Sequence, residues 1–312
     1  QDDVPDGGIP AVGLNGGAQT VDTSKYYGSS SDYEKATTDT FTVKFEQDLK
    51  KNSTFANTTR YGKTNQEILL TTPSNYSVSA NTVTTSLHPK WQENELFTNQ
   101  SNISTTFNTG SLVHNISTGI EITKENQLTK SYTSQTAKTL NLYNPESISW
   151  SDLSFSGVRS DGETTTVGAY LFDSINIGEK FILTGGGRFD RYDTTNNAVV
   201  ASTATTHPTL PVGTLVPSTL EDDGHLNSYK AGLVYKPVEN GSVYISRATT
   251  QLPPGGANFT FSTTTTNQNY PTMEPQKSVT DEIGTKWDLL NNRVSVTTAI
   301  YQTVVENEVM TE

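Results

Sequence analysis

The feature that most restricts the fold of this chain is a series of paired segments with period-two alternation of apolar and polar residues. Five hairpins are predicted, at about 40–61, 84–122, 165–193, 226–250 and 279–305. Each hairpin has a short central turn, and these turns use Asn, Gly, Asp or Pro, residues that tolerate or preset turn geometry. Longer polar stretches separate the hairpins, at about 62–83, 123–164, 194–225 and 251–278.

Long loops on every second connection are unusual in a compact soluble domain. Strands of about ten residues, with short turns at one end and long loops at the other, are typical of an outer-membrane β-barrel. The sequence therefore predicts an all-β, antiparallel, up-and-down barrel with long extracellular loops. Residues 1–39 are predicted to be loop-like, and residues 40–312 to form a partial barrel of about ten strands. A soluble β-sandwich or a fibre with long loops is the alternative.

The amino-acid composition excludes several classes of protein. Only 32% of the 312 residues are hydrophobic and 17% are charged, so the polar surplus consists of Thr, Ser and Asn rather than the charges typical of disorder. A net charge of −12 argues against nucleic-acid binding. The absence of Cys excludes disulfides and thiolate metal sites. No apolar run approaches the roughly 18 residues of a membrane-spanning helix, and the N-terminus lacks a signal-peptide pattern, which indicates a cytosolic chain, a processed chain or a fragment.

One strand carries charges on a single face. In the segment 181–193, Arg188 and Asp190 alternate with Phe189 and share their face with Thr184, while Phe181 and Leu183 lie on the other face. A charge facing lipid at mid-bilayer costs about 2–4 kcal/mol, so charged strand residues should point inward. Arg188 and Asp190 are therefore predicted to form an ion pair on a lumen wall, with contact to a plug as the alternative.

Several motifs occur in an order that resembles one family. They are GGGRFDRYD at 185–193, SYKAGLVYKP at 228–237, NGSVYIS at 240–246, EPQKS at 274–278 and DEIGTKWD at 281–288. This series resembles the TonB-dependent outer-membrane siderophore receptors, and the opening segment Val4–Pro10 resembles their catecholate-type branch. Such receptors have a plug, about 22 strands and a terminal aromatic residue. The resemblance therefore identifies the chain as an internal barrel segment without the plug or the C-terminal strands.

The resemblance implies a transport function in the bacterial outer membrane. The transported ligand would be a ferric catecholate siderophore, the surroundings outer-membrane lipid, and the energy source a TonB-type protein acting through a plug absent from this chain. No directly bound cofactor and no enzymatic activity are expected. The alternative function is a secreted or surface structural protein, such as an adhesin or a fibre subunit, that assembles through open strand edges. A polysaccharide-active enzyme would need a carboxylate pair, and none is convincing.

Candidate site residues follow from ligand chemistry. No catalytic or metal site is predicted, because the four His residues are widely spaced and no Ser lies in a nucleophile motif. Ferric catecholates are anionic and aromatic, so their pocket should combine cations with aromatic rings. The predicted ligand residues are Tyr26, Tyr27, Arg60, Tyr76, Trp91, Trp150, Arg159 and Tyr270. The aromatic ones could instead form an interfacial girdle or pack within loops.

Overall fold

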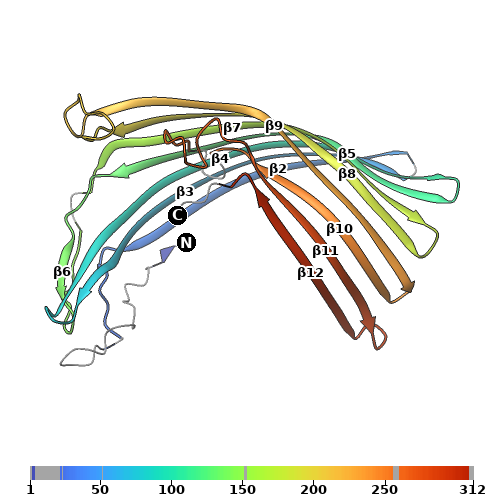
Figure 1. The fold of residues 1–312 in the computed structure, drawn as a ribbon, viewed down its shortest axis with the longest axis horizontal. Helices are drawn as coiled ribbons and strands as arrows, with labels where there is room; N and C mark the ends of the chain where they lie inside the picture. Colours follow the sequence, from blue (N-terminus) through green and yellow to red (C-terminus); the bar gives the residue numbers. More distant parts are fainter. Residues whose placement is uncertain are drawn as a thin grey trace.

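A computed structural model describes residues 2–3, 22, 24–50, 52–150, 153–255 and 260–308. They form a single 12-stranded sheet in which neighbouring strands are antiparallel and, with one exception, follow chain order (Figure 1). The exception is β6, which pairs with β4. In this part of the chain no helix is long and apolar enough to cross a membrane. The opening segment Val4–Pro10 lies outside the described residues.

The strands differ greatly in length, and ten of them have 12 residues or more. Their bounds are β1 (Asp2–Asp3), β2 (Tyr33–Lys50), β3 (Ser53–Ser77), β4 (Thr82–Thr109), β5 (Leu112–Tyr132), β6 (Lys138–Asn141), β7 (Phe155–Ile177), β8 (Phe181–Ala201), β9 (Leu215–Val238), β10 (Gly241–Leu252), β11 (Gln276–Leu289) and β12 (Val294–Glu306). The ten long strands confirm the predicted all-β partial barrel of about ten up-and-down strands.

The sheet is an open arch rather than a closed barrel (Figure 1). Within the described ranges, β12 pairs with β11 alone and does not meet the opposite edge at β1 and β2. The short turns between β2 and β3, β4 and β5, β7 and β8, β9 and β10, and β11 and β12 all lie at one end of the arch (Figure 1). The curvature leaves a concave and a convex face, between which side chains alternate.

The predicted long loops are mostly wrong in their extent. Residues 62–83 contain a turn of only four residues between β3 and β4, and the rest is strand. The predicted loop 123–164 begins within β5 and ends within β7, and the predicted loop 194–225 begins within β8 and ends within β9. β2 begins at Tyr33, inside the predicted loop 1–39. Only 251–278 remains largely a connection, between Leu252 and Gln276.

The physical reason is that both faces of these strand ends are polar. A strand with two polar faces shows no period-two signal, yet its backbone can still pair. Polar side chains also bond across the ladder: the Thr164 and Thr194 hydroxyls are 2.8 Å apart, and those of Thr38 and Thr64 are 3.1 Å apart. These pairs lie beyond the apolar part of the sheet, where sequence alternation fades.

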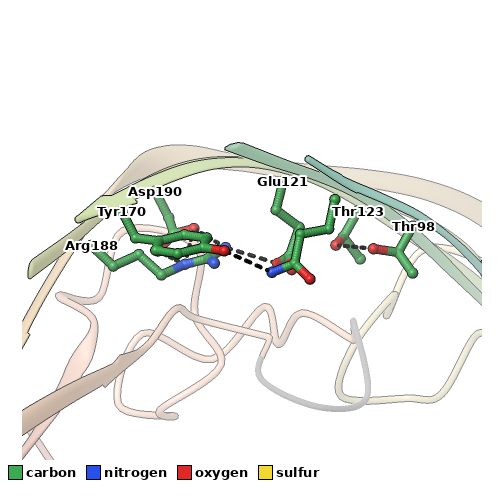
Figure 2. Close-up of polar contacts among 7 residues, drawn as sticks. Thr98, Glu121, Thr123, Tyr170, Arg188 and Asp190 are labelled. Carbon is green, nitrogen blue, oxygen red and sulfur yellow. Dashed lines mark hydrogen bonds and ion pairs between the residues drawn. The ribbon is translucent and has the colours of Figure 1, made fainter. Parts of the chain in front are cut away.

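In the half of the sheet near the short turns, one face is largely apolar and the other largely polar. Arg188 and its in-register neighbours point into the hollow of the arch (Figure 2), so the alternate residues lie on the convex face. Large hydrophobic side chains exposed there include Phe41, Val43, Phe45, Ile120, Ile122, Val167, Leu171, Phe189, Ile245, Ile283 and Ile300. We call this set the convex apolar band. Ion pairs such as Lys124–Glu163, with Nζ and Oε1 2.9 Å apart, begin just beyond it on the same face.

The buried core is small and lies at the other end of the arch. Tyr27, Val83, Leu140 and Leu142 form a cluster that joins the segment before β2 to β4 and β6. The Tyr27 hydroxyl donates to the Leu142 carbonyl, and the two are 115 positions apart in sequence. Because a single curved sheet has no second layer to pack against, most other large apolar side chains stay exposed on the convex face.

The convex apolar band should respond to charge as a lipid-facing surface does. Ile120 is 58% exposed within the band, and Ile120→Lys in the full-length protein is expected to lower the unfolding free energy in lipid vesicles by about 2–4 kcal/mol. Thr58→Lys, on the concave face, is the matched control and should cost less than half as much. Equal losses for both variants, measured by denaturant titration in vesicles, would show that lipid does not cover the band.

Candidate functional site

An ion-pair network crosses the concave face from β8 to β5. Arg188 Nε donates to both carboxylate oxygens of Asp190, at 2.8 and 2.9 Å. Its Nη2 donates to Glu121 Oε1 at 2.9 Å (Figure 2). The Arg188 side chain is 25% exposed and that of Asp190 only 10%. The predicted Arg188–Asp190 pair is therefore formed, and Glu121 extends it across β7.

Tyr170 lies beside this network on β7 (Figure 2). Its hydroxyl accepts from the Asn102 amide at 2.8 Å and from the Gln100 amide at 3.3 Å, both on β4. Together the contacts cross the ladders between β4, β5, β7 and β8. We call Gln100, Asn102, Glu121, Tyr170, Arg188 and Asp190 the concave polar network.

Two glycines make room for this network. Gly168 stands in register between Glu121 and Asp190, and a Cβ there would lie 2.3 Å from both Arg188 Nη2 and Asp190 Oδ1. Gly119 occupies the equivalent place beside Tyr170, whose hydroxyl would lie 2.8 Å from a Cβ at that position. The side chains of the network therefore lie flat across neighbouring strands because those strands carry no side chain there.

A cavity of about 520 Å³ lies on the same face, farther from the short turns. Arg60, Glu125 and Tyr192 line it, and Leu252–Pro254 closes it from the side of the β10–β11 connection. Within the described residues Arg60 has no ion-pair partner. Burial raises the pKa of the Glu125 carboxyl, so this carboxyl retains a proton more readily than an exposed one. The cavity thus combines one cation, Arg60, with the carboxyls of Glu95 and Glu125.

Tyr192 connects the cavity to β9. Its hydroxyl donates to Asp222 Oδ2 at 2.8 Å. Burial raises the pKa of Asp222, the hydrogen bond from Tyr192 opposes that rise, and the neighbouring Asp223 adds to it. This contact fixes the Tyr192 ring as part of the cavity wall.

The structure does not gather the predicted ligand residues into one pocket. Arg60 lines the concave cavity, Trp91 lies on β4, Arg159 is exposed on β7, and Tyr270 is half-buried in the β10–β11 connection. Tyr26 and Tyr76 are partly exposed at 42% and 37%. Tyr27 and Trp150 are buried at 1% and 8%. Contact of these eight residues with a ligand stays a prediction.

The buried aromatic residues serve as anchors for the segments around them. Trp150 Nε1 donates to Thr71 Oγ1 at 2.7 Å, and the Thr71 hydroxyl and backbone N–H in turn donate to Asp32, at 2.7 and 3.1 Å. The chain between β6 and β7 is thereby held against β3 and the segment before β2. For Tyr27 and Trp150 the structure thus shows the alternative role, packing within loops.

Sequence reasoning missed Glu121, Tyr170, Asn102 and Gly168. Their positions near Arg188 are set by the register of three neighbouring ladders, and this register cannot be read from the sequence. Alternation alone could have placed each on a polar face of its own strand, but not next to the others.

His114 lies 2.6 Å from Asp173 on the convex face, and within the described ranges no three His, Asp or Glu residues are placed to hold a metal ion.

Comparison with known proteins relates this chain to TonB-dependent receptors. Residues 2–312 match the family model described as TonB dependent receptor-like, beta-barrel. The catecholate siderophore receptor Fiu of Escherichia coli K12 is 38% identical over an alignment that covers 99% of this chain and 45% of Fiu. The probable TonB-dependent siderophore receptor PiuA of Acinetobacter baumannii is 31% identical, over 98% of this chain and 44% of PiuA.

A solved structure shows the same fold. The closed form of the ferric-catecholate import receptor Fiu from E. coli K12 superimposes with a TM-score of 0.89 at 36% identity, covering 98% of this chain and 48% of Fiu. The chain therefore spans about half the length of the relatives that it matches.

Filling the space at Gly168 should break the concave polar network. Gly168→Ala is expected to lower the unfolding free energy by about 1–3 kcal/mol, because Arg188 and Asp190 must move. Gly185→Ala is the matched control, since the nearest atom to its Cβ would be 3.9 Å away, and it should be neutral or slightly stabilising. Equal destabilisation of the two variants in denaturant titrations would contradict this role of Gly168.

A pH-dependent contact joins β2, β3 and β5 beyond the convex apolar band. The hydroxyls of Tyr33 and Tyr132 donate to Glu67 Oε1 at 2.8 and 3.0 Å. Burial, and then the bond to Glu67 and its charge, raise the pKa of Tyr33 to about 12. The stabilisation is therefore complete below the ordinary tyrosine pKa of about 10 and lost as the pH rises through about 12.

The test compares the wild type with Tyr33→Phe. The difference in their unfolding free energies should be about 1 kcal/mol at neutral pH and should shrink as the pH rises above about 10. Tyr235→Phe, far from Glu67, serves as a control. A difference for Tyr33→Phe that does not change with pH would contradict the contact.

Proposed function

The chain belongs to the TonB-dependent receptor β-barrel family, and from this premise we propose that it forms part of the barrel of a ferric-catecholate receptor of the bacterial outer membrane. The observation that carries the proposal is the 38% identity to a catecholate siderophore receptor along 99% of the chain. The receptor would bind an anionic iron chelate from outside the cell and pass it through the barrel.

The two faces of the sheet support this proposal. The convex apolar band suits contact with lipid, and the concave polar network suits a water-filled or plug-filled lumen. Lipid does not accommodate a sheet edge whose backbone groups are unpaired. We therefore infer that the edge of β12, which is unpaired among the described residues, pairs with further strands of the same receptor to close the barrel.

The concave cavity supports the choice of ligand. Arg60 offers a cation without an ion-pair partner among the described residues and Tyr192 an aromatic ring, beside the carboxyls of Glu95 and Glu125. The cation and the ring are the groups that an anionic aromatic complex would use. Iron would enter as part of the transported chelate, without a resident cofactor of the receptor.

Energy would come from a TonB-type protein of the inner membrane, which acts on the family through a plug. The relatives in hand are transport receptors rather than enzymes, and we propose that this chain likewise performs no covalent chemistry. The open edge of the sheet is also what a fibre subunit or an adhesin would use, and the identity to siderophore receptors is the reason that we propose transport.

Iron uptake tests the proposal. The reading frame that contains residues 1–312 is expressed in a strain without its own catecholate receptors, and radiolabelled ferric catecholate is supplied under iron limitation. Uptake at least tenfold above the empty vector is expected. The same strain without TonB, and a ferric hydroxamate as ligand, are the controls and should give background values.

Two results would overturn the proposed function. One is background uptake of every ferric catecholate although the receptor is present in the outer-membrane fraction. The other is uptake that persists unchanged without TonB, because the transport would then be passive.

A further inference from the structure

The ladder between β4 and its neighbour on the β5 side is interrupted far from the short turns. The pairing of β4 with β5 ends at Trp91, and β6 pairs with β4 only over Thr82–Thr85. Between them, Ser86–Lys90 face the longer segment 131–137, and within the described part of the chain they have no ladder partner on that side. Pro89 suits such a position, because it has no backbone N–H to leave unpaired.

A cavity of about 390 Å³ occupies this interruption, and we call it the wall cavity. Of its lining residues the argument uses Trp91, Lys130, Tyr132, Thr133 and Gln135. None of them lines the concave cavity or belongs to the concave polar network. The volume lies at the low end of the roughly 300–1,000 Å³ of small-molecule sites. It therefore suits a ligand with one ring better than a chelate with several rings around an iron ion.

Two cations stand opposite each other at the edge of the wall cavity. Lys130 pairs across the ladder with Arg159 on the same face of the sheet. Like charges in directly opposed positions destabilise a sheet, and an anion bound between them would relieve the repulsion. Elsewhere on the convex face, Lys63 and Lys124 each have a carboxylate at 2.9 Å. Neither Lys130 nor Arg159 has one among the described residues.

The carboxylates at the neighbouring positions are already engaged. Glu67, which is in register with Trp91, accepts hydrogen bonds from two tyrosine hydroxyls. Asp161, two residues from Arg159, accepts one from the Asn126 amide at 2.9 Å. The two cations therefore remain available for an external anion. A carboxylate matches the planar guanidinium of arginine especially well, because two parallel hydrogen bonds can form.

Aromatic rings surround one of these cations. The Lys130 ammonium lies 4.2 Å from the centroid of the Trp91 ring and 5.5 Å from that of Phe155. The Tyr132 ring packs on Phe155 with centroids 4.7 Å apart, and its hydroxyl is held by Glu67. The rings thus have fixed orientations beside the cation. A further ring in the cavity would pack against them edge-on or offset.

Polar groups complete the lining of the wall cavity. The Thr133 hydroxyl and the Gln135 amide belong to it, and both side chains can donate and accept hydrogen bonds. They are suitable partners for hydroxyl groups on a ligand ring. Cations, aromatic rings and polar groups in one small cavity together fit a hydroxylated aromatic carboxylate.

The height of the site shows that the ligand comes from water. Lys130 lies on the same strand and face as Ile122 of the convex apolar band, eight residues farther from the short turns. At about 3.3 Å per residue and a tilt of about 45°, this places Lys130 roughly 20 Å beyond the band. The headgroup layer is only about 5–8 Å deep on each side of a bilayer. A lipid is therefore excluded as the occupant, and a soluble acid has free access.

We propose that the wall cavity binds an iron-free, hydroxylated aromatic carboxylate from the external medium. Lys130 and Arg159 hold the carboxylate, Trp91 and Tyr132 pack against the ring, and Thr133 and Gln135 bond its hydroxyl groups. The site lies on the outer wall and not on the transport path. Its binding is measured without iron and without TonB, so this inference and the proposed function can fail independently.

Three small ligands separate the contributions of charge and ring. Binding of 3-hydroxybenzoate, phenol and acetate to the full-length receptor in detergent is measured by isothermal titration calorimetry. 3-Hydroxybenzoate should bind at least about tenfold more tightly than phenol, which lacks the charge, because a charged hydrogen bond contributes about tenfold in affinity. It should also bind more tightly than acetate, which lacks the ring. Equal affinity of 3-hydroxybenzoate with either of the other ligands would overturn the proposal.

Substitutions then locate the site. Lys130→Gln with Arg159→Gln should weaken binding of 3-hydroxybenzoate by at least about tenfold and leave phenol unaffected. Trp91→Leu should weaken 3-hydroxybenzoate and phenol alike, by about fivefold. Lys124→Gln is the matched control, because Lys124 lies on the same strand and face but is paired with Glu163, and it should bind as the wild type does.

Circular dichroism should show that all of these variants keep their β-structure. An unaffected double variant, or an equal loss in Lys124→Gln, would place the ligand elsewhere and overturn the proposal. Displacement of 3-hydroxybenzoate from the wall cavity by an equal concentration of a ferric tris-catecholate would overturn the assignment to an iron-free acid.

Discussion

The continuous antiparallel ladder is the constraint on which the other features of this structure depend. Side chains alternate between faces along each strand, so a one-residue slip in any pairing would exchange the concave and convex sets. Arg188 reaches Glu121 across Gly168 on β7, which stands in register with Glu121 on one side and with Asp190 on the other. The concave polar network is therefore a direct consequence of correct pairing on three adjacent ladders. A sheet with one strand out of register would place a buried ion pair against lipid.

The sheet is divided along its length into two chemical zones. Near the short turns, an apolar convex face opposes a polar concave one, which is the arrangement that a membrane wall requires. Farther out, both faces are polar, and a small core around Tyr27 and Val83 holds the connecting segments in place. The concave cavity lies in this outer zone.

Much of the fold could be predicted from the sequence, but little of the candidate site. The five short turns, the antiparallel order and the Arg188–Asp190 pair follow from local alternation and turn chemistry. The lengths of β3, β4 and β9 do not, because Thr and Asn on both faces conceal the period of two. Tyr27 and Trp150 resemble ligand residues in a polar chain, yet long-range contacts bury them. Burial depends on partners more than 70 residues away, which no local pattern reports.

The sequence by itself determined the class of fold, the faces of the residues in the segment 181–193, and the resemblance to siderophore receptors. These properties are encoded locally, in alternation, turn residues and ordered motifs. Only the tertiary structure decided which polar residues meet, because Glu121, Tyr170 and Arg188 come from three strands and their distances depend on register and curvature. It alone also showed that Lys130 stands opposite Arg159 across the ladder between β5 and β7. Pairing across strands is a property of the ladder, and no single strand contains it.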